Sequence, residues 1–313
     1  MTKPISGGSL QEAELPRAAS VAWPAPAARR ESPFAEGLRR LRRSHTAVLG
    51  AAIVAVLLVV AALADVLAPY DPSANDQTAT FARPSWDHPL GTDQLGRDML
   101  SRVIHGTRIS LLVGVSSVLL ALFLGVPVGL LAGYYGGRID GALMRVMDLI
   151  LAFPIYLLAI ILMVIFTPTA GLLGAIKVTG AIAIVRIPIY ARLARGSVLS
   201  IKEKEFVEAS RALGVRDPSI LVRHVLPNCL APIIVTTTLG IATAIIVEAT
   251  LSFLGLGTQP PTPSWGWDLK ANVAFIQANL WLSLFPGLAI FVTVLGFNLF
   301  GDGLRDALDP RLK

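Results

Sequence analysis

The sequence predicts an all-α polytopic membrane protein with six transmembrane helices. Of its 313 residues, 54% are hydrophobic and 15% are charged, and the mean hydropathy is +0.65. A soluble domain carries about 25% charged residues. Here the charges gather in a few segments and are absent from long runs, which is typical of helices that cross a bilayer. The basic residues flank the apolar runs, so the net charge of +6 indicates membrane anchoring and not nucleic-acid binding.

The N-terminal part, residues 1–45, is rich in Pro, Ala, Ser and Arg and shows no helical periodicity before Phe34. We therefore expect a basic, disordered tail. The LRRLRR cluster at Leu38–Arg43 precedes the first apolar run, where it acts as a positive-inside anchor, with nucleic-acid binding as the weaker alternative. Because these residues are polar, no cleavable signal peptide is predicted.

The apolar runs divide the rest of the chain into two parts. Residues 46–106 comprise a first transmembrane helix and an external loop, and residues 107–313 form a core with five further transmembrane helices. A helix needs about 20 apolar residues to cross the hydrocarbon core at a rise of 1.5 Å per residue. The predicted spans cover residues of about 46–67, 107–135, 143–166, 171–191, 229–249 and 275–300, the last beginning at either 275 or 281.

Several residues refine these spans. Asp93 is expected to cap a short amphipathic helix that precedes the second span. Pro154 is expected to kink the third span. Arg186 interrupts the fourth span, and we expect it to lie at the inner membrane interface. Glu248 is expected to mark the end of the fifth span, and the Pro-rich apolar segment 251–272 is expected to dip into the outer interface. Gly125 and Gly129, four residues apart, predict close helix packing in the second span.

The distribution of Lys and Arg predicts the orientation in the membrane. The tail and segment 192–228 together hold fifteen of these residues, whereas the two long external loops hold about four. Cytoplasmic segments carry the excess of basic residues. Both termini are therefore predicted to lie in the cytoplasm.

Motifs for catalysis are absent from the sequence. It contains no HExxH, no GxSxG and no GxxxxGK[ST], so the chain has no phosphate-binding loop for ATP. The four His residues lack the spacing of metal ligands, and Cys229 is the one cysteine, most simply a small hydrophobic residue. A membrane transport protein of this kind is a channel, a gradient-driven carrier or part of a machine powered by its partners. The candidate acidic residues, Asp148 and Glu248, fall at predicted span ends, which disfavours ion coupling.

Residues Glu205–Asn228 form the longest polar segment in the apolar second half. The pattern predicts two short helices joined by a tight turn. Gly214 stands where the first helix ends, because glycine accepts the left-handed conformation. Asp217 is expected to cap the second helix, and Pro227 to bend or end it. From the pattern alone, the segment is either a folded cytoplasmic loop without a partner or a docking element.

This segment resembles the EAA loop of bacterial ABC importer permeases. The residues EASRALG at Glu208–Gly214 are followed after nine residues by HVLP at His224–Pro227. The family pattern is E-A-A, three residues, G, nine residues, I-x-L-P. Ser210 replaces the second Ala, and His224 replaces the Ile, as in the peptide-transporter branch, which often has R-H-x-L-P-N.

Three further stretches resemble the C-type subunit of the dipeptide/oligopeptide/nickel permeases. The resemblance covers about residues 45–313. Arg186 departs from it, because the family commonly has an apolar or aromatic residue there. The three stretches are HPLGTDQLGRDMLSRVIHGTRISL (88–111), YARLARGSVLSIKEKEFVEASRALG (190–214) and EATLSFLGLGTQPPTPSWG (248–266).

The resemblance implies a type I ABC importer permease (MetI-like) fold. It also implies that the chain is the transmembrane permease subunit of an ATP-driven importer for di- or oligopeptides in a bacterial inner or plasma membrane. Its partners would be a homologous B-type permease subunit, two ABC ATPase subunits and an extracytoplasmic substrate-binding protein. No cofactor is expected on this chain, since ATP and Mg²⁺ would bind the ATPase subunits.

The resemblance also assigns the contact with the ATPase subunits to the cytoplasmic loop 192–228, through Glu208–Pro227. Alternative cargoes within the same machinery are nickel complexes, glutathione, haem-like compounds or sugars. Alternatives of another class are a gradient-driven carrier or a membrane scaffold. The predicted coupling residues are Glu208, Ala209, Ser210, Gly214, Val215, Asp217, His224, Leu226 and Pro227.

Overall fold

The computed structural model describes residue 39, residues 41–42 and residues 44–308. This part of the chain is helical and contains isolated bridges but no strand, so the predicted all-α fold class is confirmed. Nearly all of the predicted tail, residues 1–45, lies outside the described residues. Within them, five helical stretches are long and apolar enough to cross a membrane. These are His45–Ala62 (α2), Met99–Tyr135 (α4), Gly171–Ile201 (α7), Asp217–Phe253 (α9 to α10) and Trp281–Leu308 (α12).

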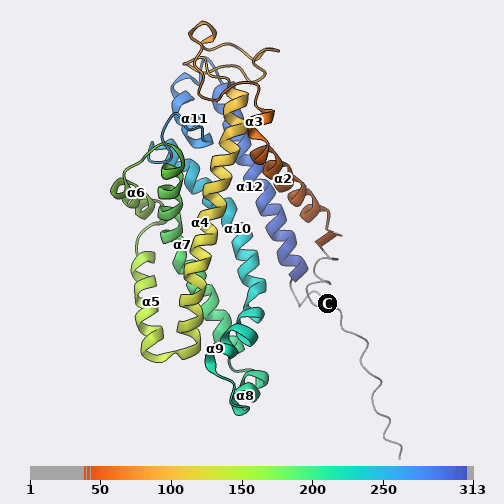
Figure 1. Cartoon of the computed structure of the whole chain (residues 1–313), viewed down its shortest axis with the longest axis vertical. Helices are drawn as coiled ribbons and strands as arrows, with labels where there is room; N and C mark the ends of the chain where they lie inside the picture. Colours follow the sequence, from red (N-terminus) through yellow and green to blue (C-terminus); the bar gives the residue numbers. More distant parts are fainter. Residues whose placement is uncertain (1–38, 40, 43, 309–313) are drawn as a thin grey trace, which may run out of the picture.

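Shorter elements join these helices at the two ends of the bundle. Figure 1 shows α8 and α9 at one end and α3 and α11 at the other. The polar segment that the sequence singled out therefore projects away from the bundle at the end opposite α11. The shorter elements are Ala64–Leu67 (α3), Gln77–Ala79 (η1), Glu205–Ala212 (α8), Asp217–Ile220 (α9), Leu221–Val225 (η2), Trp265–Asn272 (α11) and Val273–Phe275 (η3), and α10 is Leu226–Phe253.

The predicted third span is two helices and not one kinked helix. Helices α5 (Gly137–Leu151) and α6 (Ile155–Phe166) meet at 88°, and together they make a sixth crossing if they count as one broken span. Pro154 stands at the N-cap of α6. Proline lacks a backbone N–H and disfavours the helical conformation in the residue before it. The chain therefore breaks here, more sharply than the kink that we expected.

Two ion pairs hold α5 against α7. Arg195 binds Asp140 at 2.5 Å, and Arg192 binds Asp148 at 2.6 Å. Both arginines lie in the last turns of α7, beyond its apolar part. Asp148 is thus paired near the end of the bundle and is not an isolated charge within it.

Helix α4 begins earlier than the predicted second span. It starts at Met99 instead of residue 107, and the carboxylate of Asp98 caps it by accepting a hydrogen bond from the Ser101 N–H at 2.8 Å. The prediction that Asp93 caps a separate short helix is wrong. Asp93 instead stabilises the preceding turn by accepting hydrogen bonds from the Leu95 N–H at 2.8 Å and the Arg97 N–H at 3.0 Å.

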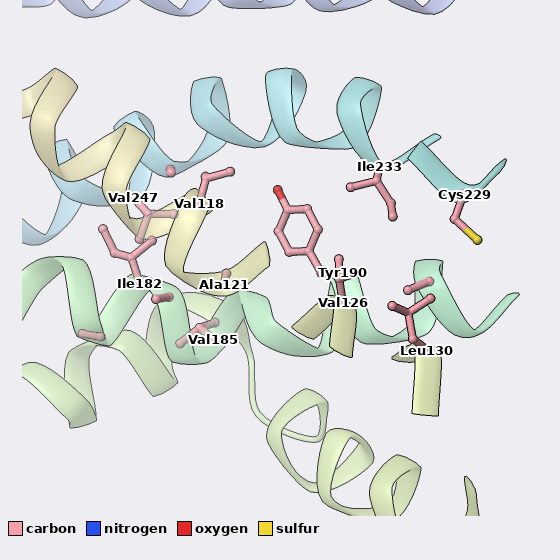
Figure 2. Close-up of a cluster of buried hydrophobic side chains, with 14 of the residues drawn as sticks. Val118, Ala121, Val126, Leu130, Ile182, Val185, Tyr190, Cys229, Ile233 and Val247 are labelled. Carbon is pink, nitrogen blue, oxygen red and sulfur yellow. The ribbon is translucent and has the colours of Figure 1, made fainter. Parts of the chain in front are cut away.

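Small residues bring α4 and α7 into close contact, as the spacing of Gly125 and Gly129 predicts. A Cβ on Gly125 would lie 2.5 Å from the carbonyl oxygen of Ile187. A Cβ on Gly129 would clash with the carbonyl oxygen of Ala191. Because glycine allows backbones to approach closely, these two positions fix the spacing of the helix pair. Figure 2 shows the apolar side chains between α4, α7 and α10 that complete this core.

Two charged residues lie deeper than the sequence indicated. Arg186 is only 7% exposed, so the prediction of an interfacial position is wrong. Its guanidinium extends sideways to Gly240 of α10, where the absence of a side chain leaves room for it. Glu248 does not end its span, because α10 continues to Phe253. Its buried carboxylate accepts hydrogen bonds from Ser110 at 3.0 Å and from Ser252 at 2.8 Å.

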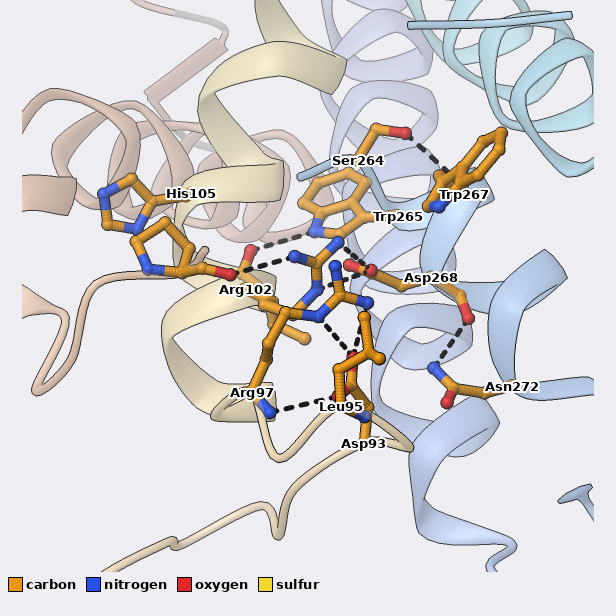
Figure 3. Close-up of polar contacts among 12 residues, drawn as sticks. Asp93, Leu95, Arg97, Arg102, His105, Ser264, Trp265, Trp267, Asp268 and Asn272 are labelled. Atoms are coloured by element: carbon orange, nitrogen blue, oxygen red, sulfur yellow. Dashed lines mark hydrogen bonds and ion pairs between the residues drawn. The ribbon is translucent and has the colours of Figure 1, made fainter. Parts of the chain in front are cut away.

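A buried polar network closes the end of the bundle that carries α11 (Figure 3). Arg102 of α4 and Asp268 of α11 form an ion pair, with Arg102 Nε 2.8 Å from Asp268 Oδ1, and both side chains are 1% exposed. Arg102 also donates to the carbonyl of Pro72 at 2.9 Å. The indole of Trp265, fully buried, donates to the carbonyl of Val103 at 3.0 Å. The Pro-rich segment that was expected to dip into the outer interface thus contains a helix, α11, that is bonded to α4.

Candidate functional site

The candidate site is the segment between α7 and α10. Helix α8 ends in a Schellman motif, in which the Gly214 N–H donates to the Arg211 carbonyl at 2.9 Å and the Val215 N–H donates to the Ser210 carbonyl at 3.1 Å. Gly214 has a φ of +78°, a conformation that glycine adopts without the steric cost of a Cβ. The predicted helix end and tight turn are therefore confirmed at Gly214.

The start of the second helix differs from the prediction. Asp217 is its first residue and not its cap, since Arg216 occupies the N-cap position and no side chain caps the helix. The Asp217 carboxylate instead accepts a hydrogen bond of 2.6 Å from the hydroxyl of Tyr134. An acidic residue in the first turn is still favourable because the helix dipole is positive there.

Pro227 neither ends the second helix nor bends it sharply. A π-helical turn, Leu221–Val225, precedes the proline, and the Leu226 N–H donates to the Leu221 carbonyl. Such a turn rearranges the hydrogen bonds just where the proline cannot donate one. Asp217–Phe253 is therefore a continuous helical stretch of 37 residues, which passes from the candidate site into the bundle.

Tyr134, near the end of α4, holds both short helices. The Arg211 guanidinium of α8 lies over its ring, 5.2 Å from the centroid, and its hydroxyl binds Asp217 of α9. The side chain of Tyr134 also raises the pKa of Arg211 above its ordinary value, as expected for a charge that is stabilised by its neighbour. Sequence reasoning missed Tyr134. The sequence places Tyr134 at the end of an apolar run, next to the polar part of the chain, but Tyr135 has the same position, so the pattern does not show which tyrosine contacts the site.

The site has a buried face and an exposed face. Val207, Ile220 and Val225 are fully buried and pack into the core between the long helices. On the exposed face, Leu213 is 83% exposed and Phe206 is 40% exposed. These two side chains give the exposed face an apolar component beside its charged residues.

The predicted coupling residues lie along this segment at one end of the bundle (Figure 1). Glu208 is exposed, and its carboxylate forms no hydrogen bond or ion pair within the described part of the chain. Among residues 39, 41–42 and 44–308, no group of three or more His, Cys, Asp or Glu side chains is placed to hold a metal ion. Glu208, Ala209, Gly214, Asp217 and Pro227 are exposed, whereas Ser210, Val215, His224 and Leu226 are half-buried.

Replacing Tyr134 by phenylalanine is expected to loosen the site without removing the ring beneath Arg211. The change deletes a hydrogen bond to a carboxylate, which contributes about 1 kcal/mol when the acceptor is partly exposed. We expect amide hydrogen exchange in α8 and α9 to rise about fivefold. Tyr135→Phe is the matched control, because the Tyr135 hydroxyl has no hydrogen bond in the described structure. Equal exchange in the two variants would contradict the role of Tyr134.

Comparison with known families accounts for most of the chain. Residues 125–313 match the family described as the binding-protein-dependent transport system inner membrane component. Residues 32–84 match the N-terminal TM domain of oligopeptide transport permease C. The two matches together include the candidate site and the first long helix.

Individual relatives agree with these matches. The dipeptide transport system permease protein DppC of Alkalihalophilus pseudofirmus is 45% identical over 282 residues, which are 90% of this chain and 91% of that protein. The glutathione transport system permease protein GsiD of Pectobacterium atrosepticum is 45% identical over 283 residues, 90% and 92% of the two chains. DppC of Haemophilus influenzae is 42% identical over 289 residues, which are 90% of this chain and 96% of that protein.

Among solved structures, an inward-facing form of the MetNI methionine ABC transporter has a similar fold. The TM-score is 0.56 at 17% sequence identity, and the match covers 67% of this chain and 98% of the other. At this identity the likeness concerns the fold, and it confirms the predicted MetI-like architecture. The exposed, anchored segment, the family matches and the relatives lead to one identification: the chain belongs to the family of binding-protein-dependent transport system inner membrane components, as an ABC importer permease of the dipeptide/oligopeptide/nickel type.

Proposed function

We propose that this chain is one of two permease subunits of an ATP-driven importer of dipeptides or oligopeptides, and that it receives the force of ATP hydrolysis through Glu208–Pro227. A homologous B-type permease, two ABC ATPases and an extracytoplasmic substrate-binding protein would complete the assembly. Both termini would lie in the cytoplasm of a bacterium. Support comes from the relatives of 42% and 45% identity and from the position of α8 and α9 at one end of the bundle.

One observation supports the coupling role above the others: the segment is exposed and yet rigidly held. Leu213 projects to solvent, while Tyr134 fixes the two helices on either side of it through Arg211 and Asp217. The exposed Leu213 side chain is therefore available for contact with a partner on a support that is held in place. Because Tyr134 belongs to α4, a movement of α8 would be transmitted directly to α4.

The path from the segment into the membrane is also continuous. Helix α9 passes through the π-helical turn into α10 without a break, so a displacement of α9 moves α10 as well. Helix α7 enters the segment from the other side. An ATPase that bears on α8 and α9 would therefore act on two transmembrane helices that adjoin one another in the bundle. ATP and Mg²⁺ would bind that ATPase, since this sequence has no phosphate-binding loop.

Glutathione is the second candidate cargo. The GsiD relative from Pectobacterium atrosepticum is as similar to this chain as the DppC relative from Alkalihalophilus pseudofirmus, each at 45% identity. Dipeptides and glutathione share amide bonds and free carboxylates, so one pathway could accept either. Uptake of labelled Ala-Ala and of labelled glutathione by the complete transporter in proteoliposomes separates the two.

Glu208→Lys is expected to weaken attachment of the ATPase subunits. Because the Glu208 carboxylate forms no hydrogen bond or ion pair in the described structure, a basic group of the ATPase can bind it, and reversal of its charge makes that contact repulsive. We expect about tenfold less ATPase to copurify, equivalent to about 1.4 kcal/mol. Import of Ala-Ala should fall in parallel.

The matched control is Glu203→Lys, which makes the same charge change at an exposed position before α8. This variant should retain ATPase and import at the wild-type level. If the two variants behave alike, net charge near the membrane explains the effect. If Glu208→Lys retains the ATPase and imports normally, Glu208 is not a docking residue.

A further inference from the structure

A cation without a counter-charge lies between the two helices that the coupling segment joins. Arg186 is at the midpoint of α7, about 22 Å from either end of that helix at 1.5 Å per residue. Its side chain is 7% exposed, and its Nε has no hydrogen-bond partner in the described structure. No ion pair involves Arg186 among the described residues.

Arg186 and Tyr190, one turn further along α7, converge on the same point of α10. A Cβ on Gly240 would lie 2.9 Å from Nη2 of Arg186 and 2.8 Å from the hydroxyl of Tyr190. Figure 2 shows the Tyr190 hydroxyl directed toward α10 beside Val118. This hydroxyl is buried and also has no hydrogen-bond partner within the described part of the chain. The Arg186 guanidinium and the Tyr190 hydroxyl, both with unused hydrogen-bonding capacity, thus lie close together in an apolar core.

The acidic side chains of the bundle do not neutralise Arg186. Glu248 is on the same helix as Gly240 but about 12 Å further along it, and Ser110 and Ser252 occupy its carboxylate oxygens. Asp148 is paired with Arg192 instead. A buried charge without a partner costs several kcal/mol, so a protein retains one where something else supplies the opposite charge.

We propose that Arg186 and Tyr190 form an anion site that binds the carboxylate of the transported molecule during its passage. A guanidinium offers two parallel N–H groups that match the two oxygens of a carboxylate, and the Tyr190 hydroxyl can donate a third hydrogen bond. The site lies at the middle of α7 and α10, away from the level of lipid headgroups, so a lipid phosphate is not its ligand.

The ligand class follows from this chemistry and from the cargo proposed above, on which the inference rests. Dipeptides and glutathione both carry a free carboxylate. The 7% exposure of Arg186 means that α7 and α10 cover the site in this conformation. Since the coupling segment joins these two helices, movement of α8 and α9 would change their separation and so uncover or cover the guanidinium.

The test uses the complete transporter in proteoliposomes, with this chain, its partner permease, both ATPases and the loaded binding protein at saturation. Labelled Ala-Ala and labelled glutathione are the probes, run in parallel. Arg186→Gln should lower the amount of probe imported per ATP hydrolysed about fivefold, because the charged hydrogen bonds to the carboxylate are lost. Arg186→Lys, which keeps the charge, should restore at least half of that import.

Thermal melting of the same complexes shows whether a loss of import comes from lost carboxylate binding or from a destabilised fold. Because Arg186 has no acidic partner, removal of its charge should leave the melting temperature of Arg186→Gln at or above the wild-type value. Unchanged import per ATP in Arg186→Gln would overturn the anion site, and so would equal losses in both variants with lowered melting temperatures. A wild-type complex that imports neither probe would reject the proposed cargo and the site together, whereas the other failures reject only the site.

Discussion

Gly214→Pro is expected to abolish import while the chain remains in the membrane at normal abundance. Gly214 has a φ of +78°, and proline holds φ near −65°. Proline also removes the N–H that donates to the Arg211 carbonyl at 2.9 Å. These losses cost about 3 kcal/mol or more, enough to unfold the turn between α8 and α9 without disturbing the long helices. Uptake of Ala-Ala, normalised to the amount of complex in the membrane, measures the effect.

A graded series shows whether conformation is the cause. Gly214→Ala should give a partial loss, because a left-handed φ costs a non-glycine residue about 1–2 kcal/mol, and Gly214→Asn should lose less. Gly141→Ala is the matched control. Neither glycine has an atom within 4 Å of the position that a Cβ would take, but the positive φ is found at Gly214 and not at Gly141. Normal import by Gly214→Pro would refute the role of a rigid turn.

Arg102→Ala is expected to cause the largest loss of stability of any single substitution considered. It leaves the carboxylate of Asp268 buried without its partner, and breaking a buried ion pair in this way costs about 3–5 kcal/mol. It also deletes the hydrogen bond to the Pro72 carbonyl, which ties the loop between α3 and α4 to α4. Thermal melting of the purified permease complex in detergent gives the size of the effect.

The double variant Arg102→Met, Asp268→Leu tests the reason for this loss. Removing both charges avoids the unpaired carboxylate, so the double variant should melt at a higher temperature than either Arg102→Ala or Asp268→Ala. Arg83→Ala, at an exposed position of the same loop between α3 and α4, is the control and should melt as the wild type does. A double variant that is less stable than both single variants would mean that the ion pair itself is strongly stabilising.

The sequence was sufficient to predict those features of the fold that depend on the properties of neighbouring residues in the chain. The spans could be predicted because charges are costly in hydrocarbon, and the sequence keeps long runs free of them. The turn at Gly214 could be predicted because glycine accommodates a left-handed residue without steric cost. The packing of α4 on α7 followed from Gly125 and Gly129, since close approach needs small residues.

The predictions that were wrong depend on partners distant in the sequence or on a helix that continues through an unfavourable residue. Asp217 binds Tyr134, 83 residues away, instead of capping its own helix. Arg186 is buried because Gly240 leaves space for it on another helix. Pro227 is accommodated by a π-helical turn, which no composition rule foresees. A kink was predicted at Pro154, and the chain does change direction there, but the 88° angle between α5 and α6 is larger than a kink.

The candidate site itself was identified by resemblance and not by local rules. Its helix–turn–helix form could be predicted, but its contact with an ATPase stays a prediction for all nine coupling residues. The division of the chain into residues 1–45, 46–106 and 107–313 also stays a prediction. Tyr134 was missed, because an apolar run gives no sign of which aromatic residue will meet a polar segment far along the chain.

The length of the continuous stretch Asp217–Phe253 sets a ratio between motions at its two ends. Its 37 residues measure about 55 Å at 1.5 Å per residue. Gly240 lies about 34 Å from the Asp217 end and about 20 Å from the Phe253 end, so a rod that pivots there has two arms of unequal length. A tilt of about 10° would then move the Asp217 end by about 6 Å and the Phe253 end by about 3 Å, in opposite directions. If α10 approaches α7 at the α8 end, it would thus move away from α7 at the α11 end. One rotation of α10 produces both movements, and the helix does not need to bend.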